Sequence, residues 1–105
     1  MPEFVPVAKV DELPPGYIKP LELNGVKIAL ANSDGTFYAV QDVCTHEAEL
    51  LSGGELEGGS IICPWHSSIF DLKTGGVQMG PATDPLETFE VKVEGNDVKV
   101  AKPGS

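Results

Sequence analysis

The feature that most constrains this chain is the placement of its soft metal-ligand side chains. Both cysteines and both histidines of the 105 residues fall within one short stretch, at Cys44, His46, Cys63 and His66. They form two arms, C-T-H and C-P-W-H, with sixteen residues between them. Thiolate and imidazole are typical ligands of transition metals. Because no other cysteine or histidine is present, the sequence predicts a metal site built from both arms.

The pairing of ligands within each arm distinguishes between metals. A structural zinc site usually takes two cysteines from one arm and two histidines from the other. Here each arm holds one of each, so each can send its cysteine to one iron and its histidine to a neighbouring iron. A [2Fe–2S] centre with two cysteines on one iron and two histidines on the other requires this arrangement. A zinc-stabilised binding domain that uses the same four ligands remains the alternative.

At this point the sequence resembles the Rieske family. The matching residues are the four ligands, the C-P-W-H setting of the second arm and the downstream G-P-A-T at residues 80–83. The resemblance covers nearly the whole chain and implies a small Rieske-type ferredoxin with one [2Fe–2S] cluster. It also implies an antiparallel all-β sandwich or barrel with a small cluster-binding subdomain inserted at about residues 42–82. In this family the imidazoles lie on the outer iron, so His46 and His66 would be the exit edge for the electron.

The resemblance assigns four further residues to the surroundings of the cluster: Trp65, Ser68, Phe70 and Pro81. Trp65 would shield the cluster from water, or would be an ordinary core aromatic. Ser68 would donate a hydrogen bond to a sulfur, or would face solvent. Pro81 would belong to a loop that covers the centre, or would be a plain turn proline. Phe70 stands where the respiratory members of the family carry a tyrosine hydroxyl.

Two departures from the respiratory pattern bear on the reduction potential. Phe70 has no hydroxyl, and the chain has no extra cysteine pair for a disulfide between the arms. Two neutral imidazoles in place of thiolates leave the oxidised centre neutral instead of −2, which raises the potential into a range of about −150 to +300 mV. Hydrogen bonds to the sulfurs tune the value within that range. We therefore expect a low-potential, ferredoxin-like member.

The rest of the chain reads as short strands between turn signals. Asn24-Gly25 is the strongest short hairpin signal, and Pro6 suggests that the first strand lies at a sheet edge. Residues 47–59, with four glycines and several acids, are expected to form a loop with one helical turn. The expected strands cover residues 4–10, 17–23, 26–31, 36–41, 60–63, 69–72, 77–79, 86–93 and 98–101. This pattern predicts an all-β fold.

Length and charge limit the possible functions. A chain of 105 residues forms one domain, 1–105, with no room for a separate substrate domain. Sixteen acids against seven lysines and no arginine give a net charge of −9, which argues against nucleic acid as a partner. No long apolar run or leader predicts a membrane anchor or secretion. The acidic residues either keep the protein in solution or steer a basic patch of a redox partner.

The functional prediction is an electron carrier and not an enzyme. Both histidines are used by the cluster, so none is left for a mononuclear iron site, and no nucleophile–base pair is evident. By resemblance, a flavin-containing reductase would supply electrons and a terminal aromatic-ring oxygenase would receive them, through transient, electrostatically steered contacts of a cytoplasmic monomer. The alternative within the same fold is a small subunit of an assimilatory nitrite reductase, in which the cluster ligands are often missing.

Overall fold

The computed structural model describes residues 3–43, 50–64, 68–80 and 84–101. Within these ranges the regular structure is strands and two short helical turns, in agreement with the predicted all-β class. The elements are β1 (Phe4–Lys9), η1 (Val10–Glu12), β2 (Ile18–Leu23), β3 (Val26–Ser33), β4 (Thr36–Gln41), η2 (Leu51–Gly53), β5 (Glu55–Glu57), β6 (Ser60–Ile62), β7 (Ile69–Asp71), β8 (Val77–Met79), β9 (Thr88–Phe89), β10 (Val91–Glu94) and β11 (Asp97–Ala101).

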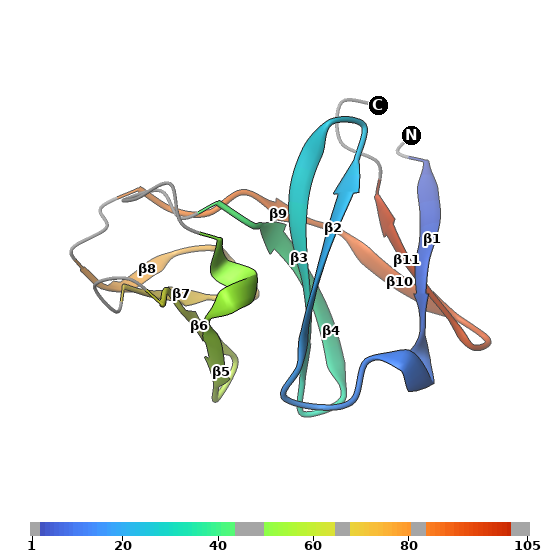
Figure 1. Cartoon of the computed structure of the whole chain (residues 1–105), viewed down its shortest axis with the longest axis horizontal. Coiled ribbons are helices and arrows are strands. Elements are labelled where there is room, and N and C mark those ends of the chain that lie inside the picture. The colour runs from blue at the N-terminus through green and yellow to red at the C-terminus, as the bar shows by residue number, and fades with distance from the viewer. Residues whose placement is uncertain (1–2, 44–49, 65–67, 81–83, 102–105) are drawn as a thin grey trace.

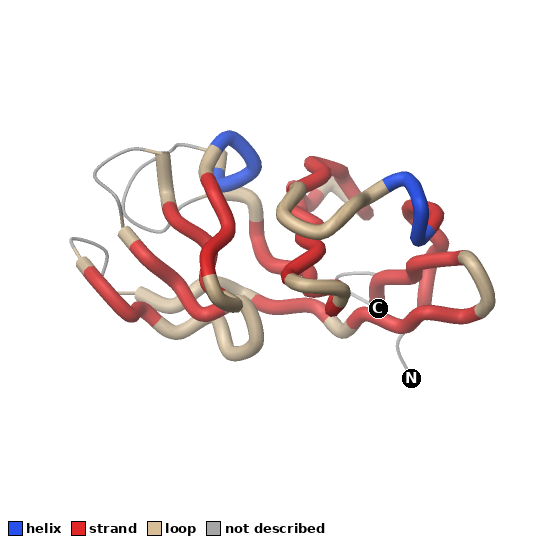
Figure 2. Tube along the Cα trace, turned by 90° about the horizontal axis from the view of Figure 1, so that it is seen from below, coloured by secondary structure: helices blue, strands red, loops and turns tan. Residues whose placement is uncertain are grey.

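Three antiparallel sheets make up the fold. Their strand orders are β1-β11-β10, β2-β3-β4-β9 and β5-β6-β7-β8. The β2-β3-β4-β9 sheet lies in the middle, with the β1-β11-β10 sheet on one side and the β5–β8 sheet on the other (Figure 1). The long axis of 38 Å runs through all three, and the view from below shows the β5–β8 sheet at one end of it (Figure 2). We call the first two sheets together the base.

The turns of the base follow from the sequence. Asn24 and Gly25 both have positive φ, 52° and 81°, and join β2 to β3 in a two-residue hairpin. Asp34 and Gly35, at 52° and 95°, do the same between β3 and β4. Positive φ at both central residues matches the right-handed twist of the strands, and glycine and asparagine tolerate it best. The hairpin predicted at Asn24-Gly25 is confirmed, and β1 lies at a sheet edge as Pro6 suggested.

Strand β3 separates two hydrophobic cores. Ile28 and Leu30 belong to the core between the two base sheets, whereas Ala29 and Ala31 belong to the core that the middle sheet shares with the β5–β8 sheet. Successive side chains of a strand point to opposite faces, so a continuous apolar run is buried on both. All four residues have no solvent-exposed area. The β5–β8 sheet is therefore fixed to the base through apolar contact, and its orientation follows from that core.

The β5–β8 sheet is inserted between β4 and β9, which themselves pair in the middle sheet. Gln41, the last residue of β4, connects the outgoing and returning segments. Its backbone N–H donates to the Glu87 carbonyl at 2.8 Å, and its side-chain Oε1 accepts from the Glu87 N–H at 2.6 Å. Its Nε2 also donates to the carbonyl of Val43 at 2.7 Å. The segment that leaves the middle sheet at Gln41 and the segment that returns to it at Glu87 are thus hydrogen-bonded together where the inserted segment begins.

Two strand predictions need correction. Residues 55–57, expected as part of a loop, form β5, which pairs with β6 through Glu55↔Ile62 and Glu57↔Ser60. Its three residues and flanking glycines give too weak a local pattern, and the partner strand decides its conformation. The single strand expected at 86–93 is two strands in different sheets, because the chain changes sheet at Glu90. The helical turn expected within 47–59 is present as η2.

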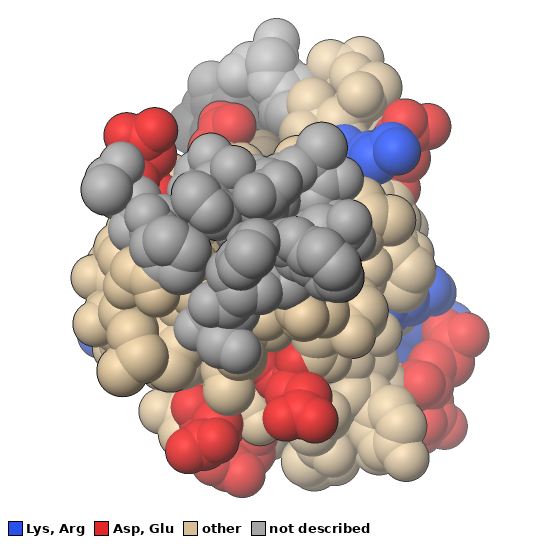
Figure 3. Space-filling model, turned by 60° about the vertical axis from the view of Figure 1, so that its left-hand side comes forward, with Lys and Arg blue, Asp and Glu red and all other residues tan. Residues whose placement is uncertain are grey.

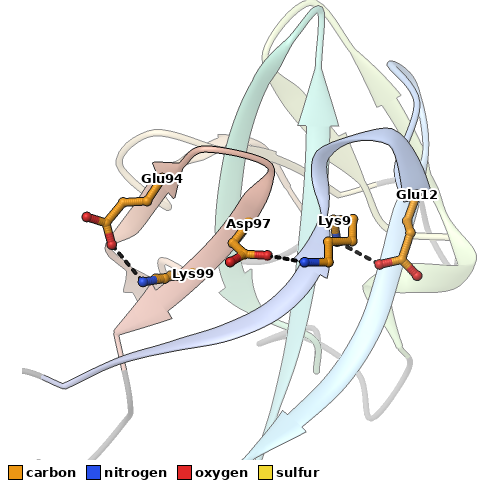
Figure 4. Close-up of polar contacts among 5 residues, drawn as sticks. All are labelled: Lys9, Glu12, Glu94, Asp97 and Lys99. Atoms are coloured by element: carbon orange, nitrogen blue, oxygen red, sulfur yellow. Dashed lines mark hydrogen bonds and ion pairs between the residues drawn. The ribbon is translucent and has the colours of Figure 1, made fainter.

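Ion pairs lie on the outer sheet of the base (Figure 4). Lys9 Nζ lies 2.5 Å from Asp97 Oδ1, and Lys99 Nζ lies 2.7 Å from Glu94 Oε1. The hydrogen bond from Lys9 lowers the pKa of Asp97, and the hydrogen bond from Lys99 lowers the pKa of Glu94. The Lys9 backbone N–H also donates to Glu12 at 2.6 Å. These lysines are therefore neutralised on the base, away from the β5–β8 sheet. Within the described ranges, no helix is long and apolar enough to cross a membrane.

Candidate metal centre

The first predicted arm is closed at its base by backbone contacts. Val43 and Leu50 form an isolated antiparallel bridge, and the Leu51 N–H donates to the Asp42 carbonyl at 2.6 Å. The chain therefore leaves and returns at neighbouring positions around residues 44–49. Cys44 and His46 lie outside the described residues. Their predicted role as ligands stays a prediction, but the structure places the ends of their arm.

The second arm follows β6 and is closed in the same way. The Cys63 N–H donates to the Ser68 carbonyl at 2.8 Å, just before β7 begins. Cys63 is 1% exposed and belongs to the core shared with the middle sheet. Trp65, His66 and Pro81 lie outside the described residues, so their predicted roles stay predictions. Cys63 is thus a buried thiol whose backbone is hydrogen-bonded to Ser68, the residue to which the second arm returns.

The segment that follows the first arm and the start of the second arm line one cavity of about 300 Å³. The residues that line it come from η2 and the segment after it and from β6 and the start of the second arm: Gly53, Gly54, Glu55, Ile62, Cys63 and Pro64. A Cβ on Gly54 would lie 1.9 Å from the Ile62 carbonyl oxygen, so only glycine permits this approach. The segment after the first arm and the start of the second are therefore in direct contact, as a centre with ligands from both arms requires.

The donor set fits an iron–sulfur centre. A buried cysteine at a cavity, on an arm that also carries a histidine, supplies a soft ligand shielded from water. Structural zinc would be held by the same atoms, so geometry alone leaves both metals open.

Ser68 and Phe70 are both fully buried. This excludes the alternative in which Ser68 is a solvent-facing serine, because its exposed fraction is 0%. Phe70 lies in β7 opposite Ile61 and Val77, in the same core as Cys63. Both therefore lie in the part of the protein that holds the second arm. Their predicted influence on the potential stays a prediction.

Sequence reasoning missed two residues that shape the site. In the sequence Asp42 is one acid among many, yet it is 2% exposed and is hydrogen-bonded to Ser52. In the sequence Gly54 is one of several loop glycines, yet it permits the close approach to Ile62 of β6. The proximity of Asp42 to Cys44 was the available signal for the first. Nothing local distinguishes Gly54 from Gly53.

Comparison with known proteins identifies the family. The family model described as "Rieske [2Fe-2S] domain" matches residues 3–90. The biphenyl dioxygenase ferredoxin subunit of Pseudomonas sp. (strain KKS102) is 40% identical over 98 residues, which are 92% of this chain and 90% of the relative. This match decides for iron–sulfur and against zinc.

Solved structures agree with the fold. The ferredoxin of carbazole 1,9a-dioxygenase from Nocardioides aromaticivorans IC177 superposes with a TM-score of 0.90 at 29% identity, over 94% of this chain and 97% of that one. A chain of the complex of reduced oxygenase and oxidized ferredoxin in carbazole 1,9a-dioxygenase superposes with a TM-score of 0.89 at 36% identity, over 93% and 92%.

The alternative of a nitrite reductase subunit shares the fold but is less similar. A putative nitrite reductase NADPH small subunit has a TM-score of 0.82 at 27% identity, over 93% of this chain and 97% of that one. The relatives at higher sequence identity are named as ferredoxin components of dioxygenase systems, which are electron carriers and not the catalytic component. Family model, relatives and fold agree, and this chain belongs to the Rieske [2Fe–2S] domain family.

Proposed function

We propose that this chain carries single electrons from a flavin-containing reductase to a terminal oxygenase that acts on an aromatic or similar compound. The observation that carries the proposal is the contact between the segment after the first arm and the start of the second arm, at the cavity beside buried Cys63, in a chain of the Rieske family. A relative of similar length is the ferredoxin subunit of a biphenyl dioxygenase, which supports an aromatic-ring oxygenase as the electron acceptor.

The proposed ligands are Cys44, His46, Cys63 and His66, holding one [2Fe–2S] cluster per chain. When bound, the cluster supplies reversible one-electron transfer at a potential raised by its two neutral imidazole ligands. The protein's own contribution is to bury the thiol of Cys63 and to close each arm by backbone hydrogen bonds. A ligand set held rigidly in both redox states reduces the rearrangement that electron transfer needs.

The proposed contact with redox partners is electrostatic and transient. Residues 42–82 carry six acids and one lysine, a net charge of −5, whereas the other 64 residues carry ten acids and six lysines, a net charge of −4. Three acids near the inserted sheet are exposed: Glu55 and Glu57 of β5, and Asp84 in the segment that returns to β9. In the view that brings this end of the molecule forward, red acidic side chains show below, at the upper left and along the right-hand edge, and blue lysine side chains lie at the edges of the view (Figure 3). This charge distribution favours partners with a basic patch.

The same proposal includes the organisation of the chain. Residues 1–105 would act as one Rieske-type ferredoxin domain, with residues 42–82 as its cluster-binding subdomain, in the form of a monomer. A cytoplasmic location is supported by the need to keep two ligand cysteines as thiolates, which a reducing compartment favours. The hydrogen bonds of Gln41 to Glu87 support rigid attachment of the subdomain.

The test is an EPR spectrum of the dithionite-reduced protein with iron and sulfide analysis. Two irons and two sulfides per chain, and an average g below that of four-cysteine ferredoxins, are the expected result. Replacing Cys63 by serine or His66 by alanine should remove the signal, because each removes one proposed ligand. Bound zinc, or a spectrum typical of four-cysteine ligation, would overturn the proposal.

A further inference from the structure

Asp42 is a buried acid, and Ser52 occupies both of its carboxylate oxygens. Among the described residues it is the one acid in the buried class, with 2% of its surface exposed. The Ser52 backbone N–H donates to Oδ1 at 2.7 Å, and the Ser52 hydroxyl donates to Oδ2 at 2.9 Å. Burying a carboxylate is unfavourable unless such bonds compensate for the lost water. The contact between Asp42 and Ser52, which we call the clasp, supplies these bonds.

The clasp lies at the base of the first arm. Asp42 is two residues before Cys44, and Ser52 follows the point where the arm returns. The Asp42 N–H donates to the Lys27 carbonyl of β3 at 2.9 Å, which attaches the acid to the middle sheet. Its carbonyl accepts from Leu51, and its side chain accepts from Ser52. One residue thus connects the sheet, the start of the arm and the end of the arm.

Closing a loop at its base limits the conformations of everything between. The bridge between Val43 and Leu50 closes the arm with backbone atoms alone, which any sequence could provide. The clasp adds two side-chain-dependent bonds one step further out, so it resists both separation of the two ends and rotation of one end about the other. The ligands carried on residues 44–49 would inherit that restriction.

We propose that Asp42 and Ser52 are positioning residues for the first ligand arm: their clasp holds the arm's base so that Cys44 and His46 are kept together in ligating geometry. This inference rests on the proposed function. Its consequence is kinetic and spectroscopic. An open arm releases iron faster and samples several ligand geometries, which broadens the EPR lines of the reduced protein.

The turn between β7 and β8 offers a matched control. Asp71 Oδ2 accepts from the Thr74 N–H at 2.9 Å and from the Thr74 hydroxyl at 2.8 Å. The chemistry is the same, an aspartate bonded by the N–H and hydroxyl of one residue, but no proposed ligand lies between the two partners. The Thr74 hydroxyl also accepts from the Gly76 N–H at 3.1 Å. Thr74→Val therefore removes a hydroxyl that is bonded to an aspartate in the same way, without opening an arm.

The experiment compares holoprotein of wild type, Ser52→Ala, Ser52→Thr and Thr74→Val. Iron release to a chelator should be about tenfold faster in Ser52→Ala, the factor expected for one lost hydrogen bond to a charged group. Ser52→Thr restores the hydroxyl and should return the rate to near the wild-type value, whereas Thr74→Val should leave it unchanged. The EPR lines should broaden in Ser52→Ala alone. A wild-type release rate in Ser52→Ala, or an equal acceleration in Thr74→Val, would overturn the proposal.

A second measurement follows the hydrogen bond directly and does not follow the iron. Amide hydrogen exchange of Ser52 in the holoprotein should accelerate in Asp42→Asn, because the N–H loses its charged acceptor. Unchanged exchange would contradict the clasp. Failure of the proposed function is recognised separately, since wild type would then lack the Rieske signal.

Discussion

Gly54→Ala tests whether the segment after the first arm must touch β6. An alanine Cβ at this position would lie 1.9 Å from the Ile62 carbonyl oxygen, and real Cβ atoms essentially never approach a neighbour within 3.0 Å. The segment at Gly54 and strand β6 must therefore separate by more than 1 Å. The obstacle is backbone of β6, which cannot swing away as a side chain would. Since the φ of Gly54 is −93°, which any residue adopts, the effect is purely steric.

The size of the effect follows from this overlap. Forcing extra atoms into a packed region costs about 3 kcal/mol at the upper end of the usual range. For a domain of this size that corresponds to a fall in Tm of about 10 °C or more. Because Gly54 lines the cavity beside Cys63, separation of β6 from η2 should also lower the iron content per chain.

Gly53→Ala is the control, because the same change one residue earlier meets only Pro64 Cγ at 3.9 Å, an ordinary contact. Both holoproteins would be unfolded by heating and followed by circular dichroism, with iron determined beforehand. Gly53→Ala should resemble wild type in Tm and iron content. If Gly54→Ala unfolds at the same temperature as Gly53→Ala, the argument for an obligatory close approach is refuted.

Two further predictions concern the potential and the pH dependence of stability. Phe70→Tyr should raise the reduction potential by about 60 mV if its hydroxyl favours the reduced form by about 1.4 kcal/mol. Voltammetry checks this, with Phe89→Tyr in the other core as the control whose potential should not shift. An unchanged or lowered potential in Phe70→Tyr would contradict the placement of Phe70. Asp97→Asn removes the exposed pair with Lys9. Because that pair lowers the pKa of Asp97, the stabilisation it gives is present above the ordinary value of 3.8 and is lost as pH falls through the lowered pKa. The pair also raises the pKa of Lys9, so the stabilisation is present below 10.5 and is lost only as pH rises through the raised pKa. The Tm difference between wild type and Asp97→Asn should therefore be largest near neutral pH and vanish in acid; a difference that persists in strong acid would contradict this account.

Much of the fold could be read locally. Asn24-Gly25 and Asp34-Gly35 predict their hairpins because few residues accept positive φ at both turn positions. The apolar run in β3 is buried on both faces, as its lack of alternation requires. What local patterns could not reveal was β5, whose three residues become a strand only against β6, and the change of sheet at Glu90. Both depend on partners distant in sequence.

The sequence by itself predicts the chemistry of the site, because ligand identity and spacing are properties of the residues. One cysteine and one histidine on each arm predict the mixed ligation, and the family model shows that the chain belongs to the Rieske [2Fe–2S] domain family. Only the tertiary structure decided how the arms are supported. Asp42 and Ser52 are ten residues apart, and Gly54 matters only because β6 passes beside it. Such contacts arise from packing between segments, so no single segment of the sequence contains them.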